Sequence, residues 1–410
     1  MRPKFKRTHH SSRTTPAGHG VNRALQKRIH RGMPSTVPPR VVHVTTVHQP
    51  FDPRIFYKQL ASLRDAGFDA HLIAPHDRDE QEHGIPIHAL PPPETRAHRL
   101  LLQPQVFRTA RSLDAALYQV HDPELLPLAF LLKAATGARI VYDMHENYRS
   151  KGALLGRALR ALERWAFRWL DHVLIAEESY RSIVDAHAVP HAYIANYFRP
   201  IGDDAPVGNG AIRETPTRLL YTGTLAKSRG LRTMVELAAE VRRTSRPETL
   251  DLVGVCHHRD QRAWAEERIR TEDLGRVIER VGWDTYVPPL AMPPHYRRAD
   301  VGLALFEPHS NYRCSLPTKF YEYLYYGLPI ICSDVPLWRR FVEQHQCGAV
   351  VPPGEPEAVL AVLDDWQAHP DQYRQCAENA RAAAPQYRWE AMGHRLVDRY
   401  RSLLGAARVA

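Results

Sequence analysis

The chain has 410 residues, of which 44% are hydrophobic, so it can bury large cores and is too long for one ordinary domain. The formal net charge of +10 comes almost entirely from residues 1–37, which hold nine Lys or Arg and no acidic residue. The remainder carries 46 basic against 45 acidic residues, so no specific nucleic-acid binding is expected of it.

Composition and cysteine spacing also bear on the cellular compartment of the protein and on whether it binds a metal. Residues 1–37 are rich in Ser, Thr, His, Gly and basic residues, which predicts a disordered basic tail without the apolar run of a signal peptide. The five cysteines form no CxxC pair, which favours a reducing compartment. The longest apolar run, Leu125–Leu132, is too short to span a bilayer. We therefore expect a cytoplasmic protein and, because no HExxH or paired Cys/His spacing occurs, no metal.

Strand-like and helix-like segments alternate from Arg40 onwards, a pattern typical of parallel βαβ units. Ligands of such sheets bind at the carboxyl ends of the strands, where we expect the side chains of His48, Asp52, Arg54, His121, Asp122 and His145. The predicted strands are Val41–Thr46, Ala70–Ala74, Leu117–Val120 and Arg139–Tyr142, and the predicted helices are Ile55–Ala66 and Leu125–Ala135.

A turn-rich polar stretch, Arg199–Pro216, separates this set from a second α/β set. This division predicts an N-terminal domain over 38–198, a second domain over 199–385, and a C-terminal helix over 386–410 for which packing back on the N-terminal domain is one option. The strands predicted there are Leu219–Tyr221, Thr249–Val253, Val277–Val281, Val301–Phe306, Pro329–Cys332 and Gly348–Val351, with helices at Gly230–Arg243 and within Glu357–Leu404.

The segment Cys314–Pro336 reads as a loop, a helix and a short apolar strand. Pro317 suits the first helical position, and Gly327 suits the residue after the last turn. Lys319 falls in the first turn, where the helix dipole disfavours a cation unless an anion such as a phosphate lies there too. Glu322 follows on the same face, where a carboxylate can accept both hydroxyls of a ribose. The alternative is an ordinary surface Lys/Glu pair.

A second basic helix start is the stretch Gly223–Gly230, GTLAKSRG, which follows a predicted strand. Its glycines and amides can approach a diphosphate closely while Arg229 neutralises it. A tight turn with solvated cations is the alternative. Paired with Lys319, this turn predicts two helix starts that converge on one diphosphate.

Five motifs occur in order along the chain: VHQPFDPRIF, VHDPELLPLA, VYDMHENY, YTGTLAKSRGL and SLPTKFYEYLYYGLPIICSDVP. Together they closely resemble glycosyltransferase family four, from about Val41 to Leu404. The resemblance implies the GT-B fold, an α/β architecture of two Rossmann-like domains with the active site in the cleft between them. It also implies a retaining enzyme whose donor is a nucleoside diphosphate sugar.

The resemblance assigns the diphosphate-binding residues. Arg229 falls where the family has its diphosphate-binding Lys, near Gly223, while Thr224 replaces an Arg that commonly precedes that Lys by five residues. Lys319 is then expected to supply part of the lost charge. Arg229, Lys319 and His145 form the expected catalytic set.

Glu322 matches the second Glu of the family's paired-glutamate motif, which holds the ribose. The first Glu of that pair would fall at Cys314, so the chain departs from the family in how the sugar ring is held. Trp283 lies where the family passes close to the base, although an indole in a core is the alternative. The candidates for holding the sugar ring are Asn311, Tyr312, Ser315 and Leu316.

On the other side of the expected cleft, His145 matches the family histidine that contacts the transferred sugar or the phosphate. A satisfied structural histidine is the alternative. The family contacts its acceptor through the first strand-to-helix loop, and turn formation alone would explain the later Asp-Pro pair. The acceptor candidates are His48, Asp52, Arg54, His121 and Asp122.

Residues 155–170 place four arginines on one helical stripe and apolar side chains on the opposite face. An amphipathic helix packed on its own domain is one explanation. The other is docking on an anionic membrane surface together with the basic tail, as expected for a lipid-linked acceptor. The arginines are Arg157, Arg160, Arg164 and Arg168.

The sequence thus predicts a glycosyltransferase of polysaccharide or glycoconjugate biosynthesis that acts on a sugar or a lipid-linked acceptor. Two alternatives stay open. One is a nucleotide-sugar epimerase of the same fold, which needs no acceptor site. The other is a non-catalytic binder of sugar nucleotides or polyanions, suggested by the missing first Glu and the basic tail.

Overall fold

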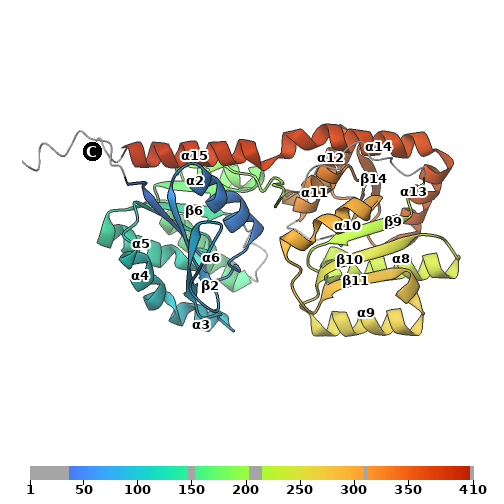
Figure 1. Ribbon diagram of the computed structural model, residues 1–410, viewed down its shortest axis with the longest axis horizontal. Coiled ribbons are helices and arrows are strands. Elements are labelled where there is room, and N and C mark those ends of the chain that lie inside the picture. Colours follow the sequence, from blue (N-terminus) through green and yellow to red (C-terminus); the bar gives the residue numbers. More distant parts are fainter. Residues whose placement is uncertain (1–36, 146–152, 203–214, 309–311, 407–410) are drawn as a thin grey trace, which may run out of the picture. The chain divides into compact units, whose positions relative to one another are not determined.

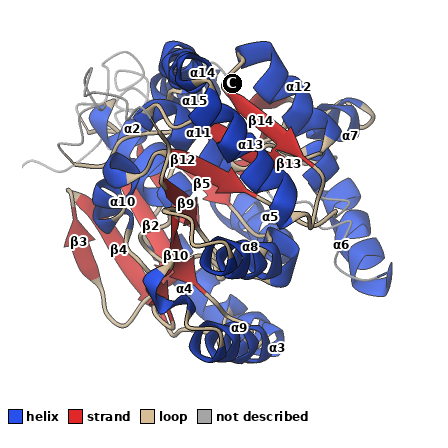
Figure 2. Cartoon of the chain, turned by 90° about the vertical axis from the view of Figure 1, so that its right-hand side faces the viewer, coloured by secondary structure: helices blue, strands red, loops and turns tan. Residues whose placement is uncertain are grey.

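The structure, a computed structural model, describes residues 37–145, 153–202, 215–308 and 312–406. These residues form two mainly parallel sheets with helices packed on them (Figure 1). Figure 2 distinguishes the strands from the surrounding helices by colour. The predicted α/β fold class is therefore confirmed. The predicted basic tail lies outside the described residues, apart from Val37.

The N-terminal sheet has eight strands in the order β3-β4-β2-β1-β5-β6-β7-β8. Neighbouring strands are parallel except β3 and β4, which form an antiparallel edge pair. The strands are β1 (Arg40–Val44), β2 (Asp69–Pro75), β3 (Glu80–Glu82), β4 (Ile85–Leu90), β5 (Leu117–Val120), β6 (Arg139–Met144), β7 (His172–Ile175) and β8 (His191–Tyr193).

The helices of this half connect the strands as in βαβ units. A π-helix, η1, continues directly into α2. The helical segments are η1 (Pro53–Leu60), α2 (Ala61–Asp65), α3 (Arg96–Leu101), α4 (Gln103–Ser112), η2 (Pro123–Leu125), α5 (Leu126–Thr136), α6 (Ala153–Ala166), η4 (Glu178–Tyr180) and α7 (Arg181–Asp185).

The second sheet has six parallel strands in the order β11-β10-β9-β12-β13-β14. They are β9 (Arg218–Thr222), β10 (Thr249–Val255), β11 (Ile278–Trp283), β12 (Val301–Ala304), β13 (Ile330–Ser333) and β14 (Gly348–Val351). The α-helices of this half are α8 (Leu231–Arg243), α9 (Arg259–Thr271), α10 (Pro293–Arg298), α11 (Thr318–Tyr326), α12 (Pro336–His345), α13 (Pro356–Ala368), α14 (Pro370–Ala383) and α15 (Trp389–Ala406). Short 3-10 turns are η5 (Lys227–Arg229), η6 (Leu274–Arg276), η7 (Pro289–Ala291), η8 (Tyr312–Cys314) and η9 (Ala384–Tyr387).

The two faces of the N-terminal sheet bury separate cores, because successive side chains of a strand point to opposite faces. Val42 and Val44 pack with helices α4, α5 and α6 on one face. Val41 packs with η1, α2 and the last helix, α15, on the other. The C-terminal helix therefore contributes its apolar side, including Trp389 and Tyr400, to the N-terminal core.

The α15 face of the sheet turns polar toward the carboxyl ends of its strands. In β5 the apolar Leu117 is followed two residues later by Gln119, and in β6 Val141 is followed by Asp143; all four are buried. Since the side-chain period of a strand is two, these polar groups lie on the face that carries the apolar core. A buried polar network results, and it forms one part of the candidate site.

Each predicted strand is present, with ends that differ by about two residues or fewer. One such difference matters: β6 runs on to Met144, so Asp143 belongs to the strand and not to the turn after it. The first helix also begins earlier than predicted. Asp52 Oδ1 accepts hydrogen bonds from the backbone nitrogens of Arg54 (2.8 Å) and Ile55 (3.0 Å) and caps η1. Arg54 therefore lies in the first helical turn, not in the loop.

Candidate active site

The loop after β9 contains Gly223 and ends at Gly230, where α8 begins. Gly230 has φ +84°, and a Cβ there would lie 1.9 Å from the Leu305 carbonyl oxygen, so only glycine fits. The Gly223 amide already donates to the Val253 carbonyl (2.9 Å), which removes it from the expected set of phosphate-binding amides. Instead, the missing side chain of Gly223 leaves space beside Arg229, whose Nη1 would lie 4.0 Å from a Cβ.

The second predicted helix start is α11. Pro317 is its N-cap and not its first helical residue, and Gly327 ends it in the left-handed conformation. Lys319 is only 5% exposed, and its Nζ lies 4.6 Å from the ring centre of Phe306. The guanidinium of Arg229 lies 5.9 Å from the same ring. Two cations on one buried aromatic ring form an environment that favours a bound anion.

Burial, followed by the charge of Arg229, lowers the pKa of Lys319 to about 7, although Glu322 opposes this shift. Without a bound anion, the Lys319 side chain therefore loses its proton more readily than an ordinary lysine. A diphosphate would supply that charge.

Glu322 is held by a tyrosine that the sequence did not single out. The hydroxyl of Tyr296 lies 2.5 Å from Glu322 Oε2 and 3.2 Å from Thr222 Oγ1. The Tyr296 ring stacks on Tyr326 with the ring centres 4.6 Å apart. Burial and the neighbouring Glu322 raise the pKa of Tyr296 well above its usual value, so it stays a hydrogen-bond donor. Tyr296 thereby fixes the orientation of the carboxylate.

These groups meet in one pocket of about 370 Å³. Five predicted donor residues line it, namely Gly223, Thr224, Arg229, Lys319 and Glu322. It also contains Asp52, which was predicted as an acceptor contact, and residues that the sequence reasoning missed, among them Lys58, Tyr286 and Tyr296. Its size falls in the range of small-molecule sites.

Lys58 brings a buried cation from η1 into this pocket. Its Nζ donates to Asn196 Oδ1 at 2.7 Å. Burial lowers the pKa of Lys58 to about 7, and the opposing attraction comes mainly from Glu322. The spacing of the η1 sequence gave no sign of this role, because the relevant partner lies in the other half of the chain.

The remaining predicted donor residues are placed differently. Trp283 is 5% exposed, belongs to the core and donates its indole N–H to the Leu252 carbonyl (3.1 Å), so the core alternative describes its side chain. The Ser315 carbonyl accepts from Trp338 Nε1 at 2.8 Å, and the Tyr312 ring packs against Phe306 and Trp338. Asn311 lies outside the described residues.

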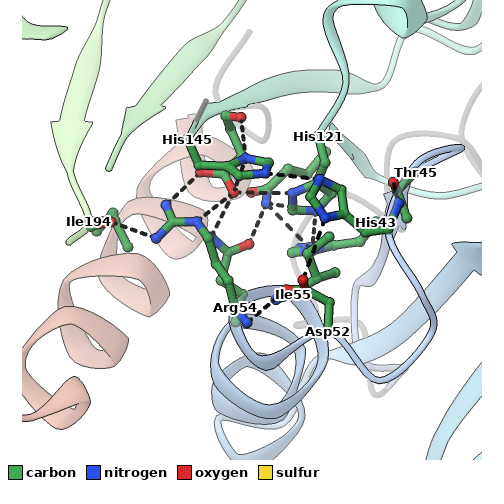
Figure 3. Close-up of polar contacts among 12 residues, drawn as sticks. His43, Thr45, Asp52, Arg54, Ile55, His121, His145 and Ile194 are labelled. Atoms are coloured by element: carbon green, nitrogen blue, oxygen red, sulfur yellow. Dashed lines mark hydrogen bonds and ion pairs between the residues drawn. The ribbon is translucent and has the colours of Figure 1, made fainter. Parts of the chain in front are cut away.

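Arg54 does not point toward an acceptor. Its Nε and Nη2 donate to the two carboxylate oxygens of the fully buried Asp143 at 2.9 and 2.7 Å, and its Nη1 donates to the Ile194 carbonyl (3.0 Å), as Figure 3 shows. Burial alone would raise the pKa of Asp143, but Arg54 outweighs it and holds this pKa well below the usual value. Arg54 thus acts as a structural ion-pair partner.

His121 and Asp122 are also buried. His121 Nδ1 lies 3.1 Å from Asp143 Oδ2, and its Nε2 lies 3.1 Å from His43 Nδ1 (Figure 3). Asp122 Oδ2 accepts from Thr45 Oγ1 (3.0 Å) and from the Thr46 backbone nitrogen (2.6 Å). Asp122 therefore positions the loop after β1, and His121 belongs to the buried network beneath it.

His145 and His48 lie at the open end of this network. His145 Nδ1 donates to the Asp143 carbonyl (3.0 Å), and its Nε2 lies 3.1 Å from His48 Nε2. His48 Nδ1 in turn faces Asp52 Oδ2 at 3.5 Å. Burial alone would raise the pKa of Asp52, but His48 holds it below the usual value. His48, Asp52 and His145 are thus brought together, as predicted for one end of the sheet.

Three described side chains, His121, Asp143 and His145, offer ligand atoms within 4.8 Å of one another, a spacing suited to a metal ion. Arg54 already binds both carboxylate oxygens of Asp143, so a cation there would lie beside a guanidinium. We therefore assign no metal to this cluster, and metal-independent catalysis stays a prediction.

Two family models match the chain, one described as a glycosyl transferase 4-like domain over residues 54–196 and one as glycosyl transferases group 1 over residues 207–383. The chain is a family-four glycosyltransferase. None of the curated protein sequences matches it significantly.

Solved structures show the fold of this glycosyltransferase. Sucrose-phosphate synthase from Thermosynechococcus elongatus matches with a TM-score of 0.69 at 16% identity, covering 90% of this chain and 100% of that one. HepE of Anabaena, in complex with UDP and glucose, matches with a TM-score of 0.68 at 14% identity, covering 89% of this chain and 100% of that one. The catalytic domain of starch synthase IV from Arabidopsis thaliana, bound to ADP and acarbose, matches with a TM-score of 0.59 at 14% identity, covering 88% of this chain and 100% of that one. The α/β fold is therefore GT-B, with two Rossmann-like domains, as predicted.

The lowered pKa of Lys319 gives the glycosyltransferase a pH signature. At pH 8 the free side chain is largely neutral, because its pKa is about 7. A bound diphosphate favours the charged form and raises this pKa, so binding takes up protons, and the affinity falls as the pH rises above about 7. We expect the heat of nucleoside diphosphate binding at pH 8 to differ between HEPES and Tris buffers. Equal heats in both buffers would contradict the assignment.

Proposed function

We propose that this glycosyltransferase moves a sugar from a nucleoside diphosphate sugar to a hydroxyl acceptor, with retention of anomeric configuration and without a metal. The observation that supports this most is the convergence of Arg229, Lys319 and Glu322 on one pocket of about 370 Å³. The buried Lys319 and the half-buried Arg229 together suit a diphosphate, and a fixed carboxylate beside them suits the ribose hydroxyls.

The chemistry is stabilisation of a leaving group. The bond between the anomeric carbon and the diphosphate oxygen breaks, and the diphosphate departs with added negative charge, which Arg229 and Lys319 stabilise. The acceptor oxygen forms the new bond on the same face of the sugar, and its proton passes to the departing phosphate oxygen. No side-chain nucleophile is needed for this balance.

The sugar and acceptor are proposed to lie near His145 and His48, at the carboxyl ends of β1 and β6. His145 is 10% exposed at the side chain and has both ring nitrogens within hydrogen-bond distance of fixed partners, so its orientation is set. It is suited to contact the transferred sugar or the phosphate, and Asp52 and His48 to contact the acceptor.

His145→Ala tests this arrangement. We expect kcat to fall roughly 10- to 100-fold through the loss of one hydrogen bond to the reacting groups, while nucleoside diphosphate affinity changes less than about threefold. The assay follows release of the nucleoside diphosphate from its sugar conjugate with a panel of acceptors. His187→Ala, in an exposed histidine, serves as the control. Conversion of the donor in the absence of any acceptor would instead point to an epimerase.

The nucleotide base is not assigned. Of the solved structures named above, that of HepE contains UDP and that of starch synthase IV contains ADP, so UDP and ADP conjugates are the first donors to test, with GDP conjugates third. The product belongs to polysaccharide or glycoconjugate synthesis in this proposal, with a sugar or a lipid-linked compound as acceptor, and the reaction takes place in the cytoplasm.

A surface of α5 and α6 supports peripheral docking on an anionic membrane. Phe130, Trp165 and Trp169 form an aromatic cluster with ring centres 5.2 to 5.4 Å apart, and Phe130 and Trp165 remain 41% and 36% exposed. Exposed arginines of the same helix region, such as Arg164, flank the cluster. Ala166 and Leu170 are buried in the sheet core, so the helix also packs on its own domain as the alternative required. No described helix is both long and apolar enough to cross a membrane.

The double variant Phe130→Ser, Trp165→Ser should lose binding to anionic vesicles. Each aromatic ring placed at a lipid interface contributes to binding, and the arginines add attraction to anionic headgroups. We expect at least about tenfold weaker sedimentation with phosphatidylglycerol vesicles. Arg270→Gln, in an exposed arginine of α9, should change nothing. Equal binding of wild type and double variant, or equal binding to neutral and anionic vesicles, would refute the docking surface.

A further inference from the structure

Glu177 lies beside the proposed sugar site, at the carboxyl end of β7. Strands β6 and β7 pair with Met144 opposite Ile175, and the Ala176 amide donates to the Met144 carbonyl (3.1 Å). His145 therefore lies opposite Ala176, and Glu177 follows one residue later at the same edge of the sheet. Glu177 is one strand away from the histidine that we place next to the transferred sugar.

The carboxylate of Glu177 also reaches the segment that precedes α11. It accepts a hydrogen bond from the backbone nitrogen of Leu316. Leu316 lies two residues after position 314, where the family motif has its first Glu and this chain has Cys. The neighbouring Ser315 carbonyl is held by Trp338, so this part of the backbone has a fixed position. The carboxylate of Glu177, from the N-terminal half, thus reaches the segment in which Cys314 replaces the first Glu of the family motif.

The surroundings of Glu177 are unfavourable for a carboxylate. Burial raises its pKa to about 8, while Arg54 and the Leu316 amide favour the charged form only in part. Tyr193, Tyr197 and Tyr321 lie close enough to sense its charge. Burial of the charged carboxylate costs free energy that Arg54 and the Leu316 amide offset only in part. Such a carboxylate is suited to accept further hydrogen bonds from a polyhydroxylated ligand.

We infer that Glu177 replaces the carboxylate missing at Cys314 and accepts hydrogen bonds from hydroxyl groups of the donor sugar. This inference rests on the proposed function, because it assigns the sugar end of the same donor. It makes Glu177 a specificity-determining residue: it distinguishes the nucleoside diphosphate sugar from the nucleoside diphosphate alone. A Glu177 that only joined the two halves would affect both ligands alike, since Leu316 lies just before Lys319.

The test compares Glu177→Ala and Glu177→Gln with wild type. The ligands are whichever of UDP, GDP and ADP the wild type binds, and the matching conjugate among UDP-glucose, GDP-mannose and ADP-glucose. We expect the affinity for the conjugate to fall roughly 10- to 100-fold, as for a lost charge-assisted hydrogen bond, with the free diphosphate bound within about twofold of wild type. Glu178→Gln is the matched control, because Glu178 is the adjacent, exposed acid paired with Arg181.

Monodeoxy forms of the conjugate, one for each ring hydroxyl, identify the contact. In wild type, removal of the contacted hydroxyl should weaken binding at least about tenfold, and in Glu177→Ala this penalty should vanish. Cys314→Glu combined with Glu177→Ala should restore part of the lost affinity. Equal losses of affinity for the conjugate and for the free diphosphate, or no loss of either, would overturn the proposed role of Glu177 but leave the proposed function standing. A wild type that binds none of the nucleotides would overturn the proposed function with it.

Discussion

Lys319→Met is expected to lower kcat by roughly 10²- to 10³-fold while leaving the protein as stable as wild type or more stable. The loss follows from removing one of two cations that stabilise the departing diphosphate. The retained stability follows because Lys319 is buried beside Arg229, and Met fills similar space without a charge to desolvate. Steady-state kinetics and thermal melting measure the two effects.

Lys227→Met is the matched control for this prediction. Lys227 belongs to the same basic loop as Arg229 but is exposed and does not line the pocket. Its replacement should change kcat less than about threefold. A Lys319→Met variant that turns over like wild type would remove Lys319 from the catalytic set, and a variant that melts far below wild type would show that its role is structural.

Arg54→Met is expected to cost about 3–5 kcal/mol of unfolding free energy, because it leaves the carboxylate of Asp143 buried without its bidentate partner. His121 and Gln59 still hydrogen-bond to Asp143 Oδ2, but neither replaces a full positive charge. Urea unfolding followed by tryptophan fluorescence and circular dichroism measures the change, with two probes because a two-domain chain need not unfold in one step.

Arg139→Met supplies the comparison. Arg139 pairs with Asp171 at 2.8 Å, but its side chain is 33% exposed, so its loss should cost less than about 1 kcal/mol. The double variant Arg54→Met, Asp143→Asn should recover part of the stability, since it removes the unpaired charge. If Arg54→Met were as stable as Arg139→Met and lost acceptor binding instead, the original interpretation of Arg54 as an acceptor contact would be correct.

Most strands could be predicted from the sequence because their residues are buried on both faces and read as short, mainly apolar runs, as in Leu117–Val120 and Val301–Ala304. Strand β3 was missed because it lies at the sheet edge, where Glu80–Glu82 is polar and partly exposed, and β4 was missed because Pro86 and His88 interrupt its apolar residues. Strand β8 was missed because it has only three residues. Strand β7 was missed although its four residues, HVLI, form a buried apolar run as long as β5.

Site residues could be predicted where one short segment contains both the chemically suitable side chain and the loop or helix that positions it. Arg229 lies in the turn between β9 and α8, and Lys319 and Glu322 lie in α11, which follows β12 after a loop. The parallel topology brings the ends of both strands to one edge of the sheet. Lys58, Tyr296 and Glu177 were missed because their roles depend on contacts with segments far away in sequence. The family resemblance implied that Trp283 lies near the base, with a core indole as the alternative. Its indole N–H donates to the Leu252 carbonyl, and the ring belongs to the core.

The most direct test of the account is calorimetric titration of the wild-type protein with UDP, GDP and ADP in the presence of EDTA, repeated with Glu322→Ala. We expect one nucleotide to bind selectively without a metal, and Glu322→Ala to bind it roughly 10- to 100-fold more weakly through the loss of its ribose contact. Absence of binding to all three by the wild type would contradict the donor site and favour a protein that uses this fold without a nucleotide sugar.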